Sequence, residues 1–263
     1  MRVGGLQRVS LLDYPGRVAA IVFTRGCNWR CPYCHNPDLV QRSTAPDVPT
    51  QGILSFLEGR RGLLDGVVIT GGEPTVHPGL VGFARSVKAM GFLVKVDTNG
   101  SDPALLRRLL AERAVDYLAM DVKGSPDRYP DIVRRPVEME EIRQSIGVVM
   151  KSGVDYEFRV TVLPRFHDEG EMAGIGRLLA GARTVYLQNF RPGRTWDPTF
   201  AKDRPCSPEA LETFRRILEG YVERSLVRDG GGEADGWRQP GAGEFSHRQQ
   251  APMFGSEKKS DIP

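Results

Sequence analysis

The chain has 263 residues, of which 40% are hydrophobic and 26% are charged, so it can close one large globular core. Its 36 Lys and Arg residues stand against 33 Asp and Glu residues, without the basic surplus that is usual in a nucleic-acid-binding protein. The apolar runs are too short to span a membrane, and the first residues lack the apolar stretch of a signal peptide. We therefore expect a cytoplasmic protein with no membrane or nucleic-acid partner.

Short β-rich segments alternate with amphipathic segments as far as about residue 228. The six segments expected to form strands are rich in Val, Ile, Tyr and Phe and cover residues 19–23, 67–70, 93–97, 117–122, 156–163 and 184–190. Apolar residues at helical spacing predict helices near residues 80–87, 105–110, 139–149 and 207–221. This alternation predicts an α/β fold with a parallel sheet curved into an open, partial (β/α)6 TIM-like barrel.

The last 35 residues differ in composition from the rest of the chain. Residues 229–263 are rich in Gly, Gln, Ser and charged side chains, and their few aromatic residues show no period. Such a segment buries too little apolar surface to offset its chain entropy, so we expect a disordered tail after a single domain of residues 1–228. The alternative is a segment that becomes ordered on a partner.

Three of the four cysteines lie together, directly after the first predicted strand. Cys27, Cys31 and Cys34 have a C-x3-C-x2-C spacing, whereas Cys206 is far away and is expected to be a bystander. Soft thiolates suit zinc or iron–sulfur chemistry. A closed zinc site would need His35 as its fourth ligand, whereas a [4Fe–4S] cluster on three thiolates keeps one iron open. We favour the cluster; a zinc knuckle or a redox-sensing thiol group is the alternative.

This cysteine loop resembles that of the radical S-adenosylmethionine (SAM) superfamily. The longer string from Ser10 to Asn36, with a D-x-P-G turn ahead of the strand, is more narrowly similar to the glycyl-radical-enzyme activases. Within them it most resembles the activating proteins of anaerobic ribonucleoside-triphosphate reductase, over roughly residues 1–225. The resemblance implies a partial (β/α)6 barrel, SAM as cofactor, and a [4Fe–4S] cluster held by the three cysteines of the loop.

A Gly-Gly-Glu-Pro segment follows the second predicted strand. Gly71 and Gly72 permit a close backbone approach, and the carboxylate of Glu73 suits an ammonium group. A tight turn without further role is the alternative. The resemblance assigns Gly71, Gly72 and Glu73 to the amino group of SAM.

Charged residues lie at the ends of the third and fourth predicted strands and within the fifth. Asp121 and Lys123 share one side of an extended segment, where a surface ion pair is the plain alternative to a function. The resemblance implies that Asp97, Thr98 and Asp121 coordinate a monovalent cation and that Lys123 and Arg159 contact SAM. For Arg159, a structural salt bridge is the alternative.

Three further contacts are implied by the resemblance. Tyr33 is expected at the adenine of SAM through its backbone, and Asp13 at a partner peptide. Pyruvate formate-lyase activases have a ribose-contacting histidine near the end of the sixth strand, where this chain has none. Gln188 or Arg191 is left for that contact.

The activity implied is that of a radical SAM oxidoreductase that forms a glycyl radical on a partner enzyme. The expected partner is anaerobic ribonucleotide reductase, with an electron donor such as flavodoxin or ferredoxin. No catalytic residue is expected beyond the cluster and SAM. The alternatives are a pyruvate formate-lyase-type activase, a small-molecule radical SAM enzyme such as 7-carboxy-7-deazaguanine synthase, and a zinc-binding module without enzymatic activity.

Overall fold

A single curved sheet organises the molecule. The structure, a computed structural model, describes residues 1–40 and 46–228. Its eight strands pair in chain order, and all neighbours are parallel except the first pair. The strands are β1 (Val3–Ser10), β2 (Ala19–Thr24), β3 (Gly66–Gly71), β4 (Leu93–Thr98), β5 (Tyr117–Asp121), β6 (Asp155–Val162), β7 (Val185–Asn189) and β8 (Ser225–Arg228).

The predicted α/β class and open barrel are confirmed. The six predicted strands are β2 to β7, and the pairing within the described residues leaves the sheet open between β1 and β8. The two outer strands were not predicted. β1 contains a Gly-Gly pair that weakens a strand pattern, and β8 has only four residues. The tail predicted to be disordered lies outside the described residues.

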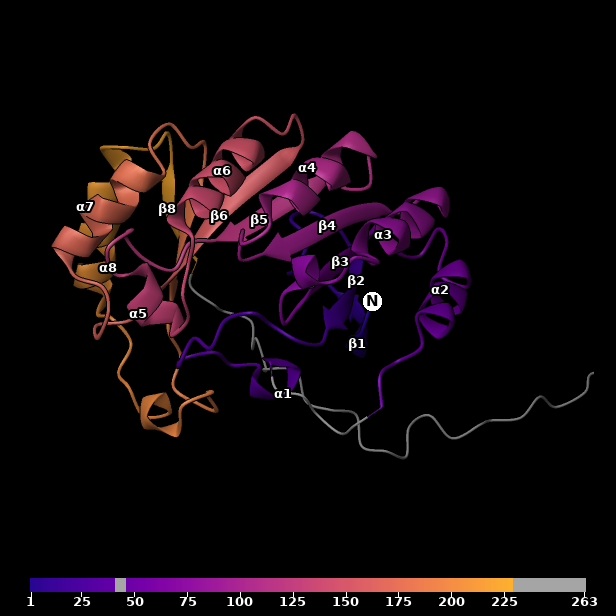
Figure 1. Ribbon diagram of the computed structural model, residues 1–263, viewed down its shortest axis with the longest axis horizontal. Coiled ribbons are helices and arrows are strands. Elements are labelled where there is room, and N and C mark those ends of the chain that lie inside the picture. The colour runs from indigo at the N-terminus through magenta and orange to yellow at the C-terminus, as the bar shows by residue number, and fades with distance from the viewer. Residues whose placement is uncertain (41–45, 229–263) are drawn as a thin grey trace, which may run out of the picture.

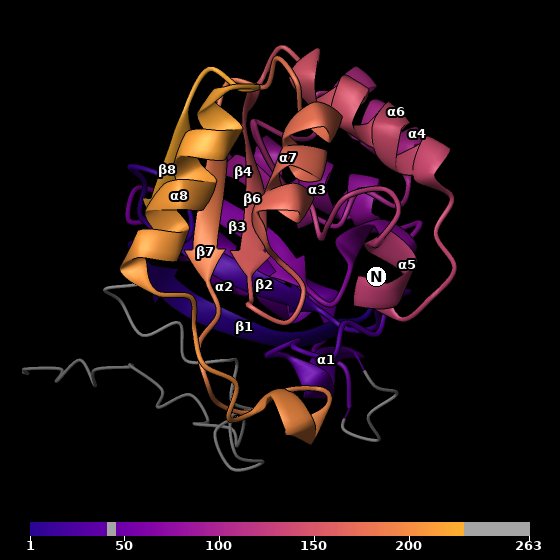
Figure 2. The same ribbon diagram turned by 90° about the vertical axis from the view of Figure 1, so that its left-hand side faces the viewer.

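Helices lie along one side of this sheet and near the carboxyl ends of its strands. They are α1 (Pro37–Val40), α2 (Thr50–Glu58), α3 (Leu80–Ala89), α4 (Pro103–Ala111), α5 (Tyr129–Val133), α6 (Met139–Met150), α7 (Glu169–Leu178) and α8 (Pro208–Glu219), with short 3-10 turns at Pro74–Val76 and Pro198–Phe200. The predicted helices correspond to α3, α4, α6 and α8. The Asp102 carboxylate accepts a hydrogen bond from the Leu105 amide, and Ser207 caps α8 in the same way. Figures 1 and 2 show α3, α4, α6, α7 and α8 along the convex side of the sheet.

The two faces of the sheet differ in character because side chains alternate along each strand. The outer face, which packs under the helices, is mainly apolar, with polar residues such as Thr24 and Thr98 at the ends of strands. Its buried apolar residues include Ala20, Val22, Val67, Ile69, Val94, Val96, Leu118, Met120, Phe158 and Val160. The inner face is apolar on β2 and β3, where Ala19, Ile21 and Val68 pack with Tyr14. On β4, β5 and β6 the inner face carries charged side chains instead.

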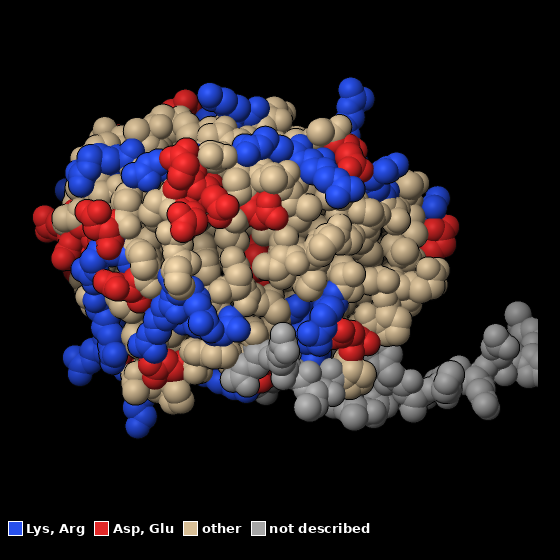
Figure 3. All heavy atoms as spheres, in the orientation of Figure 1, with Lys and Arg blue, Asp and Glu red and all other residues tan. Residues whose placement is uncertain are grey.

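The carboxyl ends of the parallel strands gather the loops that matter for function. In Figure 2 the arrowheads of β6 and β7 point towards α1 and the Pro198–Phe200 turn. In parallel barrels, binding and catalytic residues lie at this end of the strands. On the face seen in Figure 3, basic and acidic side chains are interspersed. Among the described residues, no helix is long and apolar enough to cross a membrane.

Candidate functional site

The cysteine loop begins where β2 ends, and the Gly71-Gly72 turn after β3 holds its first residues. The Gly72 amide donates to the Thr24 carbonyl at 2.9 Å, and the Glu73 amide donates to the Gly26 carbonyl at 2.8 Å. A Cβ atom on Gly72 would lie 2.1 Å from the Gly26 oxygen, and Gly71 has a φ of +115°. Glycine is therefore required at both positions, because the turn and the loop entry touch through their backbones.

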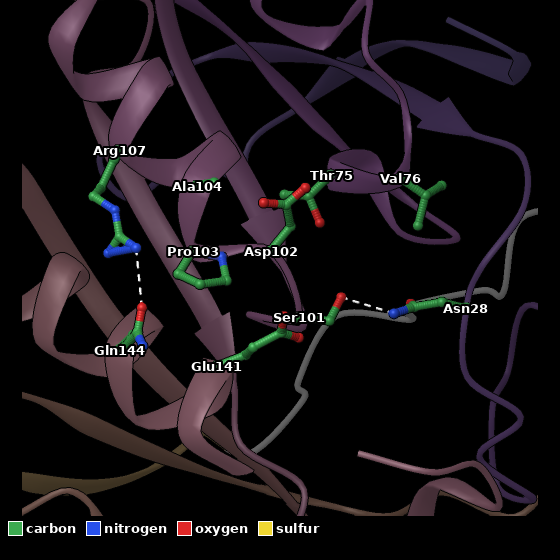
Figure 4. Close-up of a pocket in the computed structure, with 10 residues that line it drawn as sticks. All are labelled: Asn28, Thr75, Val76, Ser101, Asp102, Pro103, Ala104, Arg107, Glu141 and Gln144. Atoms are coloured by element: carbon green, nitrogen blue, oxygen red, sulfur yellow. Dashed lines mark hydrogen bonds between the residues drawn. The ribbon is translucent and has the colours of Figure 1, made fainter. Parts of the chain in front are cut away.

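The rest of the loop is tied to three other segments. The Asn28 amide nitrogen donates to Ser101 Oγ at 2.8 Å, and Asn99 Nδ2 donates to Asn28 Oδ1 at 2.9 Å. The Arg30 amide donates to the Val133 carbonyl, and the Trp196 amide donates to the Cys34 carbonyl. Figure 4 shows Asn28 reaching Ser101 at the edge of a groove of about 520 Å³. The sequence analysis did not predict Asn28 or Ser101, since neither carries a metal-ligating or titratable group.

The three cysteines of the loop are half-buried. Burial raises the pKa of Cys27 and of Cys31 to about 12, and it also raises the pKa of Cys34. The Lys123 ammonium opposes this effect at Cys31 and Cys34. Burial disfavours the charged thiolate when no metal is present. A bound metal ion displaces the thiol proton and stabilises the thiolate.

This donor set fits an iron–sulfur cluster. Cys27, Cys31 and Cys34 supply three soft sulfur ligands on one loop. Beside them the Tyr33 hydroxyl is buried without a hydrogen-bond partner among the described residues. Burial raises its pKa, and the charge of Cys31 raises it further, which locates this hydroxyl near the thiols. A buried polar atom of this kind is usually paired, and a cluster sulfide is an acceptor that could pair with it.

The alternative zinc site finds no support in the geometry. The His35 ring stacks on Phe190 with a centroid distance of 5.2 Å, and its Nδ1 lies 3.3 Å from the Arg194 carbonyl oxygen. Within residues 1–40 and 46–228, no group of three or more His, Cys, Asp or Glu side chains is placed to hold a single metal ion. Cys206 packs in the main core, and its backbone exchanges two hydrogen bonds with the Asn189 side chain.

Glu73 is the hub that joins the ends of β3 and β4. Its side chain is 1% exposed, and one carboxylate oxygen accepts from the Thr75 amide, Thr75 Oγ1 and Thr98 Oγ1. The other oxygen accepts from the Asn99 amide at 2.7 Å. Burial raises the pKa of Glu73, although these hydrogen bonds favour the charged form. The carboxylate thus already accepts four hydrogen bonds within the protein.

A chain of five alternating charges crosses the inner face from β4 to β6. Lys95 Nζ lies 2.5 Å from Asp97 Oδ1, and Arg159 Nη1 lies 3.0 Å from Asp97 Oδ2. Arg159 Nε lies 2.8 Å from Asp121 Oδ1, and Lys123 Nζ lies 3.2 Å from Asp121 Oδ2. We call these five residues the inner charge chain. The sequence predicted four of its members; Lys95, which reads as an interruption of an apolar strand, was missed.

Opposite charges stabilise the ionised form of each carboxylate in this chain. Burial by itself would raise the pKa of Asp97, but Arg159 and Lys95 together hold it below its ordinary value. The same competition between burial and the charges of Arg159 and Lys123 lowers the pKa of Asp121. Burial opposes the charge of Lys123, whereas Asp121 and Cys31 raise its pKa. The chain therefore links the cysteine loop electrostatically to β4, β5 and β6.

The other predicted residues are more scattered. Asp13 is exposed in the turn between β1 and β2, and its side chain is hydrogen-bonded to Ser10. It therefore lies near the amino end of β2, whereas the cysteine loop follows the carboxyl end of that strand. Gln188 is half-buried on β7, and Arg191 is exposed just beyond that strand. Thus the structure brings the cysteines, the Gly-Gly-Glu turn and the inner charge chain together, but not Asp13.

Comparison with known proteins gives this arrangement a family. The family model described as "Radical SAM superfamily" matches residues 21–173. A protein of Methanocaldococcus jannaschii named as a glycyl-radical enzyme activating enzyme is 30% identical over 244 residues, which cover 86% of this chain and 95% of the relative. A pyruvate formate-lyase-activating enzyme of Clostridium pasteurianum is 28% identical over 74% of this chain and 82% of its own length.

Solved structures share the fold at much lower identity. SuiB of Streptococcus suis matches with a TM-score of 0.59 and 12% identity over 80% of this chain, which spans about half (48%) of the SuiB chain. Coproporphyrinogen III oxidase of Escherichia coli, described as a radical SAM enzyme, matches with a TM-score of 0.53 and 18% identity over 80% of this chain and 52% of its own. A superfamily model that covers more than half of the chain, together with a relative that matches along nearly its whole length, identifies this protein as an enzyme of the radical SAM superfamily, which uses a [4Fe–4S] cluster and SAM.

Proposed function

We propose that this protein is a glycyl-radical enzyme activating enzyme. The observation that carries the proposal is the 30% identity to a relative of that name along 95% of the relative's length. A second relative is named as the activating enzyme of pyruvate formate-lyase. When bound, the cluster and SAM supply an electron transfer that cleaves SAM into methionine and a 5′-deoxyadenosyl radical, which takes a hydrogen atom from a glycine of the partner.

The proposed roles of the protein's own residues are to hold and to orient. Cys27, Cys31 and Cys34 would bind three irons and leave one open for the amino and carboxylate groups of SAM. Hydrogen bonds tie the loop to four other segments, so it would hold its ligands in place. The backbone of Tyr33 is proposed at the adenine.

The Gly71-Gly72 turn and the inner charge chain would place the methionine part of SAM. Lys123 and Arg159 offer donors for a carboxylate and are themselves fixed by Asp121. Glu73 would act as a positioning residue, because its carboxylate already joins the ends of β3 and β4. Asp97, Thr98 and Asp121 remain the proposed neighbours of the methionine part of SAM.

For the partner we propose anaerobic ribonucleoside-triphosphate reductase, with flavodoxin or ferredoxin as electron donor. The turn that contains Asp13 would contact the partner. It also carries the two most exposed large apolar side chains among the described residues, Leu11 at 69% and Leu12 at 72%. Exposed apolar patches of this kind mark protein-binding surfaces. The second candidate partner is pyruvate formate-lyase, which the name of the relative from Clostridium pasteurianum favours.

Anaerobic reconstitution with iron and sulfide, followed by reduction in the presence of SAM, tests the chemistry. We expect a [4Fe–4S] absorption and EPR signal and the release of 5′-deoxyadenosine. The Cys27→Ala/Cys31→Ala/Cys34→Ala variant should lose both signals. Cys206→Ala is the matched control, since that thiol packs in the core away from the loop, and it should keep both. Absence of the cluster signal from the intact protein would refute the proposal.

Incubation with each candidate partner tests the rest of the proposal. We expect a glycyl-radical EPR doublet on anaerobic ribonucleoside-triphosphate reductase and a weaker one, or none, on pyruvate formate-lyase. The Leu11→Ser/Leu12→Ser variant should lose the glycyl radical but keep the release of 5′-deoxyadenosine without partner. A doublet on pyruvate formate-lyase alone would replace the first partner by the second.

A further inference from the structure

We propose that Lys95 supplies, as a built-in ammonium group, the positive charge that a bound monovalent cation would bring to Asp97, so that this site works without such a cation. The inference deepens the proposed SAM site and depends on it. Resemblance to the activases implied a cation at Asp97, Thr98 and Asp121. The contacts of these three side chains do not fit that role.

Every side-chain oxygen in question already has a hydrogen-bond or ion-pair partner. Both oxygens of Asp97 are engaged, one by Lys95 and one by Arg159. Both oxygens of Asp121 are engaged as well, by Arg159 and by Lys123. Thr98 Oγ1 donates to Glu73 and accepts from the Gly100 amide. A cation at Asp97 would therefore compete with these partners, and Lys95 already occupies the carboxylate oxygen of Asp97 that Arg159 does not contact.

The charge balance leads to the same conclusion. The inner charge chain has three cations and two carboxylates, so it already carries one net positive charge. Without Lys95 the remaining four groups would be neutral, with one oxygen of Asp97 free, and a cation there would restore the present net charge. With Lys95 in place and before SAM binds, a cation would raise the net charge of the inner charge chain from one to two in a largely buried site, which is costly.

Lys95 is also held in a way that suits this role. Its side chain is 2% exposed, and lysine is rarely so buried unless it is paired. It stands two residues before Asp97 on the same strand, so both side chains project from the same face. Its ammonium lies 5.8 Å from the centre of the Tyr117 ring, which offers a second favourable contact. The strand thus fixes the ammonium beside the carboxylate before any ligand binds.

The test compares salts at one ionic strength. The reconstituted protein is placed in potassium, sodium or tetramethylammonium chloride, the last being too large to sit among carboxylate oxygens. The Kd for SAM and the melting temperature are then measured. For the natural sequence we expect the same values in all three salts. A Kd that is weaker by about tenfold or more in tetramethylammonium, equivalent to about 1.4 kcal/mol, would overturn the proposal.

The Lys95→Met variant should turn the site into a cation site. In tetramethylammonium its Kd for SAM should rise by about tenfold or more, and potassium or sodium should restore it. Lys88→Met is the matched control, because Lys88 also lies 2.5 Å from a carboxylate, that of Asp116, but away from the inner face. It should lower the melting temperature equally in every salt. A Lys95→Met variant without any difference among salts would refute the role of Lys95.

The two readouts separate this proposal from the proposed function. Neither SAM binding nor melting requires a partner, so failure to form a glycyl radical would leave both results standing. If SAM binds in no salt, the proposed SAM site fails. The melting temperature of the Lys95→Met variant would still test the cation in that case, because Asp97 would lack its ammonium partner whether or not SAM is bound.

Discussion

The two faces of the sheet are built from alternate residues of the same strands, yet one mainly stabilises the fold and the other carries the charged side chains of the candidate site. On the outer face, β4, β5 and β6 present mainly apolar side chains to the helices, with Thr98 at the end of β4 as the polar exception. On the inner face the same three strands carry Lys95, Asp97, Asp121 and Arg159. The outer face accounts for much of the burial that stabilises the fold. The inner face holds charges at some cost in stability, which is typical of a site built for ligands.

Phe158 and Arg159 are neighbours on β6 that point to opposite faces, so they allow the sharpest comparison. Phe158 is fully buried beneath the helices. The Phe158→Ala variant should lose about 3–5 kcal/mol of unfolding free energy, because it leaves a cavity in the main core. Denaturant unfolding measures this loss, which we expect to be independent of pH. If Phe158→Ala lost much less unfolding free energy than a variant of the inner face, the outer face would not be the main source of stability.

Replacement of Arg159 should cost less and should depend on pH. Arg159→Met leaves one oxygen of Asp97 and one of Asp121 without their partner. Breaking a buried ion pair costs about 3–5 kcal/mol, and we expect the low end because Asp121 is 29% exposed. The control, Arg61→Met, removes an exposed pair and should cost less than about 1 kcal/mol.

The sign of the pH dependence follows from the two carboxylates. In the intact protein the pKa values of Asp97 and Asp121 lie below their ordinary values. Their pairs therefore stabilise the fold above the unfolded pKa of about 4, and this stability is lost as the pH falls through the lower folded values. In Arg159→Met the cost of the unpaired carboxylates shrinks once they are protonated. The difference in unfolding free energy from the intact protein should therefore narrow from pH 7 to pH 4; a constant difference would show that packing, not charge, is lost.

Gly72 lies where β3 ends and the loops begin, beyond both faces of the sheet. Gly72→Ala places a Cβ atom 2.1 Å from the Gly26 carbonyl oxygen, which is backbone and cannot rotate away. Overpacking of this kind costs about 1–3 kcal/mol, and it should displace the loop that carries the cysteines. Relative to the intact protein, this variant should show a large loss of cluster content after reconstitution but only a small decrease in melting temperature. Normal cluster content in this variant would mean that the Gly-Gly turn does not position the loop.

The outer face was far easier to predict from the sequence than the inner one. Runs such as Val94, Val96 and Leu118, Met120 follow the strand period and revealed β4 and β5, because burial under helices demands apolar residues there. Cysteine spacing identified the loop for a similar reason, since soft metals restrict the residue types that can bind them.

The sequence could not reveal how inner-face groups are shared. Lys95 looked like an exception within an apolar strand, and only the register that pairs β4 with β5 and β5 with β6 brings it into one chain with Arg159. The hydrogen bonds to Glu73 could not be predicted either, because the four donors come from two segments that are distant in sequence, Thr75 after β3 and Thr98–Asn99 at the end of β4. Contacts between segments distant in sequence depend on tertiary structure, which a local pattern does not encode.

The smallest predicted effect concerns α6, which packs on the outer face of the sheet. Gly147 stands inside α6, and a Cβ atom there would meet nothing within 4 Å. Alanine is favoured over glycine in a helix interior by about 0.8–1 kcal/mol, so Gly147→Ala should raise the unfolding free energy by that order. It should leave cluster content and the Kd for SAM unchanged, in contrast to Gly72→Ala. If it altered SAM binding, the helical layer would be coupled to the inner face, and the two faces could no longer be treated as separate contributors to stability and function.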